Sequence, residues 1–290
     1  MNAPVHPDWA RAGGDWPNRE ASDFVQVGPV RWHYQRMGSG PVLVLLHGAG
    51  AATHSWRDLL PLLAEHFDVI APDLPRHGFT RTQARQQCAL PAMAEAVTAL
   101  LAHLRVRPAV MVGHSAGAAI ALETVLSGQL EPDRVIGLNA ALTPFRGMAG
   151  VVFPPLAKAL ALNPFVPWVF SGFASGAAQV RKLIDGTGSR IDARGLELYG
   201  RMVRRPDHVD GALAMMALWD LNPLLARLSK LETPVDLVVG MGDRTVDPQE
   251  AIRLSEQVPA IHLHRVDGLG HLMHEEAPEQ FSEMIGSLAT

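Results

Sequence analysis

The chain has 290 residues, of which 48% are hydrophobic and 19% charged, and this composition excludes a largely disordered protein. The single cysteine, Cys88, excludes an internal disulfide, a cysteine-type zinc site and an iron–sulfur cluster. The net charge of −4 argues against nucleic acid as the main partner.

The N-terminal segment 1–16 is polar and lacks a basic region followed by an apolar one, so we expect no signal peptide and a cytoplasmic protein. Residues 159–180 carry no charge, which is enough length on paper to span a bilayer. Pro164, Pro167, Gly172 and Gly176 interrupt this stretch. It therefore favours an apolar surface segment over a spanning helix, and peripheral membrane association stays open.

The apolar pattern predicts strands that alternate with helices, as in a mostly parallel sheet covered by helices. A hairpin is expected first, with strands at 24–27 and 30–36 around Gly28-Pro29. Short, continuous apolar runs then mark strands buried on both faces. Further strands are predicted at 42–46, 69–71, 109–112, 135–138, 235–239 and 261–266, and helices at 55–66, 90–104, 115–127, 248–257 and 278–288.

The alternation stops between 143 and 227, where the sequence is rich in Pro, Gly, Met and Trp. A segment of this length is too long for a loop. We therefore predict an α/β core formed by 1–142 and 228–290, with a helical cap at 143–227. The cap should lie over the carboxyl edge of the sheet, where open α/β sheets place their binding sites.

The strongest motif is Gly113-His114-Ser115-Ala116-Gly117, between a predicted strand and a predicted helix. A nucleophile on such a turn needs strained backbone angles, and the flanking glycines remove side chains that would clash. The new helix N-terminus also favours negative charge nearby. Ser115 is therefore the candidate nucleophile.

A second turn, His47-Gly48-Ala49-Gly50, follows the predicted strand 42–46. At this position small residues allow a substrate carbonyl to reach the backbone. We expect the N–H groups of Ala49 and Ala116 to form an oxyanion hole, each stabilising the transition state by about 3 kcal/mol. His47, Gly48, His114 and Trp219 are more tentative candidates for contacts with the substrate.

The candidate base is His271, which follows the last predicted strand and completes the order Ser, Asp, His along the chain. Two aspartates follow the strand 235–239. Asp247 precedes Pro248 and is explained as a helix N-cap, so Asp243 is the preferred partner of His271. His274 is expected to be solvated or packed. Arg76 and His77 follow Asp73 and could either contact a substrate carboxylate or lie on a surface loop.

The arrangement of these motifs resembles the α/β-hydrolase superfamily from about residue 24 to the end of the chain. More finely, four segments resemble the magnesium chelatase accessory proteins of bacteriochlorophyll biosynthesis. The sequences that carry this likeness are DWPNRE at 15–20, GAGAATHSW at 48–56, GLNAAL at 137–142 and LGHLMHEE at 269–276, with HVDGAL at 208–213 in the cap. One departure is Arg76, where such proteins usually have Gly.

These features predict a serine hydrolase that acts on an ester or related acyl bond and needs no metal or other cofactor. The resemblance implies a setting in magnesium-tetrapyrrole biosynthesis, with a small hydrophobic substrate such as a tetrapyrrole or an ester, and contact with the magnesium chelatase. The alternative is an accessory protein that binds a tetrapyrrole or the chelatase without catalysis. Other chemistry on the same scaffold, such as C–C bond hydrolysis, also stays open.

Overall fold

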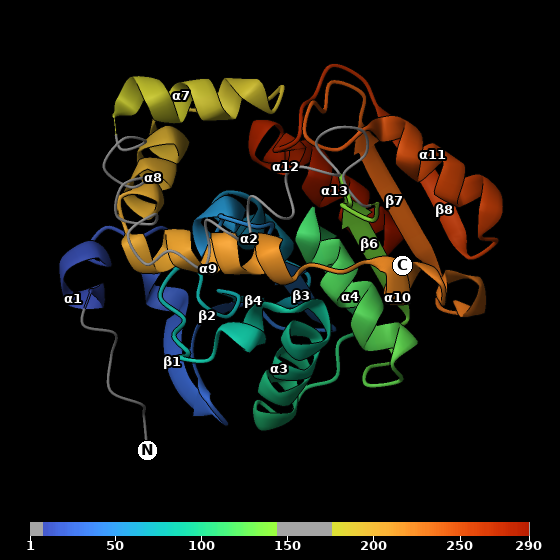
Figure 1. The fold of residues 1–290 in the computed structure, drawn as a ribbon, viewed down its shortest axis with the longest axis horizontal. Coiled ribbons are helices and arrows are strands. Elements are labelled where there is room, and N and C mark those ends of the chain that lie inside the picture. Colours follow the sequence, from blue (N-terminus) through green and yellow to red (C-terminus); the bar gives the residue numbers. More distant parts are fainter. Residues whose placement is uncertain (1–7, 144–175, 290) are drawn as a thin grey trace.

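The structure is a computed structural model that describes residues 8–143 and 176–289. Most of the charge-free stretch 159–180 lies outside the described residues. An eight-stranded sheet forms the centre, in the order β1-β2-β4-β3-β5-β6-β7-β8 (Figure 1). β1 and β2 form the antiparallel hairpin, β2 pairs antiparallel with β4, and the remaining neighbours are parallel. The strands are β1 (Ser22–Val27), β2 (Val30–Met37), β3 (Val42–Leu46), β4 (Asp68–Pro72), β5 (Val110–His114), β6 (Arg134–Leu138), β7 (Val235–Gly240) and β8 (Ile261–Val266).

Helices cover both faces of this sheet. The strand β3 shows why its sequence is apolar throughout: Val44 and Leu46 join the core beneath α3 and α4, whereas Leu43 and Leu45 join the core beneath α2 and α13. These helices are α2 (Leu59–Leu63), α3 (Leu90–His103), α4 (Ala116–Leu126) and α13 (Pro278–Leu288), and α11 (Pro248–Gln257) packs beside β7 and β8.

Between β6 and β7 the described residues form helices and no strand. These are α7 (Ala177–Gly186), α8 (Ala193–Val203), α9 (Pro206–Leu218) and α10 (Asn222–Leu225). Figure 1 shows α7, α8 and α9, coloured yellow to orange, grouped on one side of the sheet, where α9 contacts the 3-10 turn at Arg85–Cys88. The division into core and cap at 143 and 228 stays a prediction.

Two expectations about local structure were wrong. The expected helix 55–66 is a 3-10 turn, Thr53–Trp56, followed by α2, because Pro61 fits only the first turn of a helix and α2 therefore begins just before it. Two short helices were not foreseen: α1 (Trp9–Ala12) and α12 (Met273–Glu276) are each one turn long, too short to show a periodic pattern. The remaining predicted helices and strands are confirmed to within two residues at each end.

Candidate active site

The nucleophile candidate occupies a strained turn. Ser115 joins β5 to α4 with φ 52° and ψ −116°, a region that residues other than glycine rarely adopt, so α4 begins at Ala116 and not at 115. A Cβ on Gly113 would lie 2.3 Å from the backbone nitrogen of Ala118, and one on Gly117 would lie 2.0 Å from the carbonyl oxygen of Leu46. Both glycines are therefore required by close backbone packing, as the sequence predicted.

The turn after β3 lies directly against this serine. A Cβ on Gly48 would be 3.1 Å from Ser115 Cβ and 3.0 Å from His114 Nδ1, so another residue here would require these side chains to shift by a few tenths of an ångström. The backbone N–H groups of Ala49 and Ala116 donate no hydrogen bond to any described residue. They are thus available to a ligand oxygen, and their assignment as an oxyanion hole stays a prediction.

The structure brings together the predicted base and acid. His271 Nδ1 lies 2.7 Å from Asp243 Oδ2, and the two side chains are 8% and 1% exposed. The other carboxylate oxygen of Asp243 accepts hydrogen bonds from the N–H groups of Thr245 (2.7 Å) and Val246 (3.0 Å). This carboxylate therefore also fixes its own loop, a structural role that the sequence did not reveal. The described contacts include no hydrogen bond between Ser115 and the His271 ring.

The competing aspartate has the structural role expected of it. Asp247 is the N-cap of α11, its Oδ1 accepts the N–H of Gln249 at 3.0 Å, and Pro248 is the first helical residue. It makes no contact with His271 in the described structure, so Asp243 is the aspartate that the fold places beside the base.

The His47 side chain is committed to contacts within the fold, and its tentative role in contacting a substrate stays a prediction. Its side chain is fully buried, its Nδ1 lies 2.8 Å from the carbonyl oxygen of Gly48, and its Nε2 accepts the N–H of Leu74 at 2.9 Å. Burial lowers the pKa of His47 and keeps the ring neutral, as these two bonds require. Its ring holds the turn 47–50 against the loop after β4.

The other tentative contacts differ in their surroundings. His114 is 2% exposed, and its Nε2 donates to the carbonyl oxygen of His271 at 2.9 Å, so the ring faces the base loop. Gly48 lies against Ser115. Trp219 caps the C-terminus of α9 and packs, partly buried, against the core beneath α3 and α4. The structure does not bring Trp219 into contact with His271, Asp243 or His114.

A buried carboxylate organises the loop after β4. Asp73 accepts hydrogen bonds from the N–H groups of Thr53 and Phe79 and lies 2.7 Å from His33 Nδ1. Burial alone would raise the pKa of this carboxyl. His33 and the N–H of Phe79 outweigh that effect and hold the pKa well below its usual range. The sequence pointed to this loop without revealing its buried partners, because His33 comes from β2.

Arg76 and His77 are committed to the fold. Arg76 has φ 65°, the left-handed conformation for which glycine is the favoured residue, so the backbone here suits the glycine of the similar proteins better than it suits arginine. Its guanidinium pairs with Asp210 of α9 and donates to the carbonyl of Thr82 at 2.8 Å. His77 is fully buried. Neither the substrate contact nor the surface loop expected from the sequence describes these residues.

His208 connects α9 to the turn after β3 and to the loop after β4. Its Nε2 lies 3.0 Å from the carbonyl oxygen of Gly50, and its Nδ1 accepts the N–H of Gly78 at 3.1 Å. The ring must therefore be neutral, and burial together with the nearby Arg205 lowers its pKa to about 4. This histidine is a further residue of the site that was not singled out from the sequence.

The depressed pKa of His208 predicts acid sensitivity. In the unfolded chain this histidine titrates near 6.5, so the stability that depends on the neutral ring is present above that pH and is lost as the pH falls towards 4. The loss should be on the order of 3 kcal/mol. His208→Gln should reduce the slope of the free energy of unfolding against pH in this window, measured by urea denaturation. His103→Gln, at an exposed site on α3, should leave the slope unchanged; equal slopes for all three proteins would contradict the assignment.

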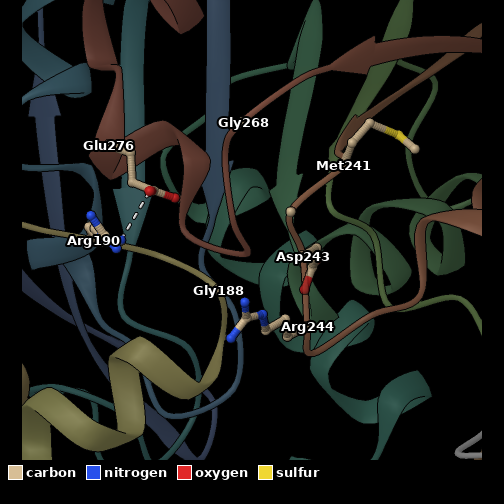
Figure 2. Close-up of a pocket in the computed structure, with 8 residues that line it drawn as sticks. Gly188, Arg190, Met241, Asp243, Arg244, Gly268 and Glu276 are labelled. Carbon is tan, nitrogen blue, oxygen red and sulfur yellow. Dashed lines mark hydrogen bonds between the residues drawn. The ribbon is translucent and has the colours of Figure 1, made fainter.

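A cleft with a volume of about 540 Å³ opens beside the acid (Figure 2). Arg190, Arg244 and Glu276 border it together with the backbone of Gly188 and Gly268. Ser115 does not line this cleft, so we do not assign it to the substrate.

The described ranges offer neither a membrane span nor a metal cluster. Helices in 8–143 and 176–289 are too short or too polar to cross a membrane. The same ranges hold no group of three or more His, Cys, Asp or Glu side chains suited to a metal ion.

Comparisons with known proteins agree with this architecture. The family model described as "Alpha/beta hydrolase family" matches residues 43–284. The chain is 45% identical over 273 residues to a protein named "Magnesium-chelatase 30 kDa subunit" from Rhodobacter capsulatus, an alignment that covers 93% of this chain and 95% of the relative. It is 29% identical to the uncharacterized hydrolase YugF of Bacillus subtilis, covering 87% of this chain and 91% of that protein.

A solved structure shows the same fold. An alpha/beta hydrolase fold protein from Burkholderia ambifaria superimposes with a TM-score of 0.76 at 22% identity, covering 91% of this chain and 97% of that one. The eight-stranded, mostly parallel sheet with flanking helices confirms the expected fold class. The chain therefore belongs to the alpha/beta hydrolase family.

Proposed function

We propose that this protein is a serine hydrolase that cleaves ester bonds. Ser115 Oγ attacks the carbonyl carbon while His271 Nε2 takes the hydroxyl proton, and His271 then returns the proton to the departing alcohol. Asp243 holds the proton on His271 Nδ1 and stabilises the imidazolium. The N–H groups of Ala49 and Ala116 stabilise the oxyanion. Water then attacks the acyl-enzyme by the same route, which releases the acid and restores Ser115.

The observation that carries this proposal is the position of the aspartate–histidine pair relative to the strained serine. The His271 main chain is hydrogen-bonded to His114, the residue that immediately precedes Ser115. The pair with Asp243 at 2.7 Å is therefore held beside the turn at Ser115, and within the described residues the N–H groups of Ala49 and Ala116 have no hydrogen-bond acceptor. A protein that only binds has no need to maintain this combination.

A hydrophobic acyl substrate is the class that the cap supports best. In the described part of the chain, Leu183 on α7 and Met216 and Leu218 on α9 are large apolar side chains that are at least 37% exposed. The charge-free sequence 159–180 belongs to the same predicted cap. Exposed apolar side chains and a charge-free sequence in the predicted cap suit an alkyl ester or an ester of a flat tetrapyrrole.

This function is tested with a panel of p-nitrophenyl esters of increasing acyl length, together with matched amides and thioesters. We expect hydrolysis of the esters, with kcat/KM rising with acyl length as more apolar surface is buried. If no ester in the panel is hydrolysed faster than in buffer alone, the hydrolase proposal is wrong.

The second candidate is an accessory protein that contacts the magnesium chelatase, a proposal supported by the 45% identical relative named "Magnesium-chelatase 30 kDa subunit". Immobilised wild-type protein should then retain purified chelatase subunits. A tetrapyrrole ligand would quench tryptophan fluorescence saturably when protoporphyrin derivatives are titrated. Retention without ester hydrolysis would favour the accessory role over the catalytic one.

A further inference from the structure

The main chain of His271 is held by two side chains from other strands. Its carbonyl oxygen accepts one hydrogen bond from His114 Nε2, at 2.9 Å, and another from Asn139 Nδ2, at 3.0 Å. Both side chains are 2% exposed, and they leave the ends of the neighbouring strands β5 and β6. Two buried donors therefore determine where the backbone of the proposed base lies.

Asn139 also connects the base loop to the strand that carries the acid. Its Oδ1 accepts the N–H of Gly240, the last residue of β7, at 2.8 Å, while its Nδ2 donates to the carbonyl oxygens of both Gly270 and His271. The residue adopts φ 44°, a conformation that asparagine tolerates better than most residues. One amide thus sets the separation between the loops that carry Asp243 and His271.

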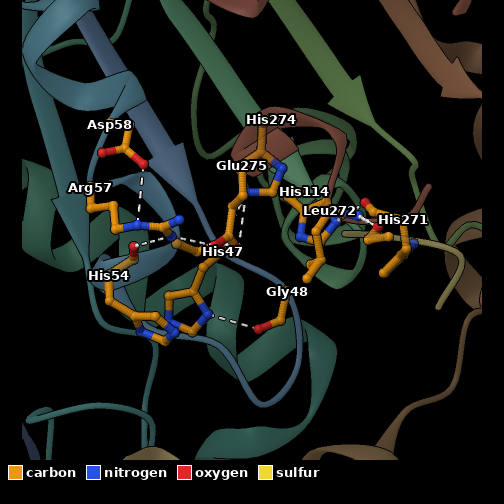
Figure 3. A network of polar contacts seen from close by, with 12 residues as sticks. His47, Gly48, His54, Arg57, Asp58, His114, His271, Leu272, His274 and Glu275 are labelled. Atoms are coloured by element: carbon orange, nitrogen blue, oxygen red, sulfur yellow. Dashed lines mark hydrogen bonds and ion pairs between the residues drawn. The ribbon is translucent and has the colours of Figure 1, made fainter. Parts of the chain in front are cut away.

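His114 is held in the orientation that this contact requires. The centroid of its ring lies 4.7 Å from that of the His271 ring and 4.5 Å from that of the His274 ring (Figure 3). His274 Nε2 in turn lies 2.9 Å from Ser55 Oγ, which donates to the buried carboxylate of Glu275 at 2.7 Å. Burial, followed by the neighbouring histidines, holds the pKa of His114 well below its usual range. The ring is therefore a neutral donor with its proton on Nε2.

We propose that His114 and Asn139 are positioning residues for His271, a role that rests on the proposed hydrolytic function. They act through the backbone and do not touch the substrate. With its carbonyl held at two points, the His271 main chain has little freedom, and the imidazole stays aligned between Asp243 and the Ser115 turn. A displacement of about 1 Å at such a site can slow a reaction by about 100-fold.

The test compares variants that remove one donor with a variant that retains it. His114→Leu removes the donor at similar bulk, whereas the amide nitrogen of His114→Gln takes the place of Nε2. Asn139→Gly removes the second donor and tolerates the positive φ. His54→Leu is the matched control, because this buried histidine has no hydrogen-bond partner for either ring nitrogen in the described structure. Thermal unfolding confirms that each variant is folded.

Two measurements separate the positioning role of His114 and Asn139 from the proposed hydrolytic function. The first is the proton NMR signal of His271 Nδ1–H, which reports the bond to Asp243 without any reaction. The second is the rate of phosphonylation of Ser115. We expect His114→Leu and Asn139→Gly to shift or lose the signal and to slow phosphonylation by about 10-fold or more. His114→Gln should restore most of both, and His54→Leu should change neither.

If the NMR signal of His271 Nδ1–H is unchanged in every folded variant that lacks one of the two donors, the positioning role is wrong, whatever the reaction rates show. If His114→Leu does not fold, Asn139→Gly and His114→Gln decide the question by the same signal. If the wild-type protein reacts with no phosphonate, the proposed hydrolytic function fails. The positioning role is still supported in that case if the NMR signal is lost in His114→Leu and retained in His114→Gln.

Discussion

Replacing Asp243 by asparagine is expected to lower kcat for ester hydrolysis by about 10⁴-fold. The carboxylate lies 2.7 Å from His271 Nδ1 and keeps the proton on that nitrogen. An amide NH₂ in its place would favour the tautomer with the proton on Nε2, which cannot accept the proton of Ser115. The side-chain oxygen of asparagine can still accept the N–H groups of Thr245 and Val246, so the loop should remain folded.

The same substitution four residues later provides the control. Asp247→Asn keeps a good N-cap on α11 and touches no residue of the proposed triad, so kcat should stay within the error of the wild type. Steady-state kinetics on one ester, with all three proteins at matched folded fractions, makes the comparison. A similar kcat for Asp243→Asn and Asp247→Asn would mean that Asp243 does not orient the base.

Replacing Gly117 by alanine is expected to destabilise the protein by about 3 kcal/mol or to prevent folding. The added Cβ would lie 2.0 Å from the carbonyl oxygen of Leu46 and 2.9 Å from that of His47. Both atoms belong to the backbone at the end of β3, which cannot move without disturbing both the sheet and the turn 47–50. Urea denaturation, followed by circular dichroism, measures the change in the free energy of unfolding.

A second helical glycine separates this clash from the general effect of the substitution. A Cβ added to Gly286 in α13 would meet no atom within 4 Å, so Gly286→Ala should stabilise the protein by about 0.5–1 kcal/mol. Stabilisation at both positions would show that α4 does not pack against β3 as closely as described.

The sheet and the two turns at its carboxyl edge could be predicted from the sequence because their signals are local. The apolar run Val42–Leu46 reports burial on both faces, and the glycines around Ser115 report a turn that no side chain can enter. The helix α11 begins at Pro248, as its capping residues indicated. The pattern that reveals each of these features lies within a few residues along the chain, although the carbonyl oxygen that excludes a side chain at Gly117 belongs to the distant Leu46.

The buried hydrogen bonds that hold the site together could not be predicted, because the two residues in each bond are distant in sequence. Asn139 reaches the carbonyl of His271, 132 positions later, and His208 reaches Gly50 across 158 positions. For the same reason the hydrogen bonds of the His47 ring could not be foreseen: its partner Leu74 is brought to it only by the pairing of β3 with β4. No periodicity or spacing encodes such pairs.

The most direct test of the proposed triad is the reaction of the purified protein with a fluorophosphonate, followed by mass spectrometry of the modified peptide. The serine oxygen displaces fluoride from phosphorus only when a base activates it, so the reagent reports an activated serine without knowledge of the substrate. We predict stoichiometric labelling of the wild type at Ser115 and none in Ser115→Ala. A folded wild-type protein that is not labelled, or that is labelled equally after Ser115→Ala, would contradict the assignment of Ser115 as the nucleophile.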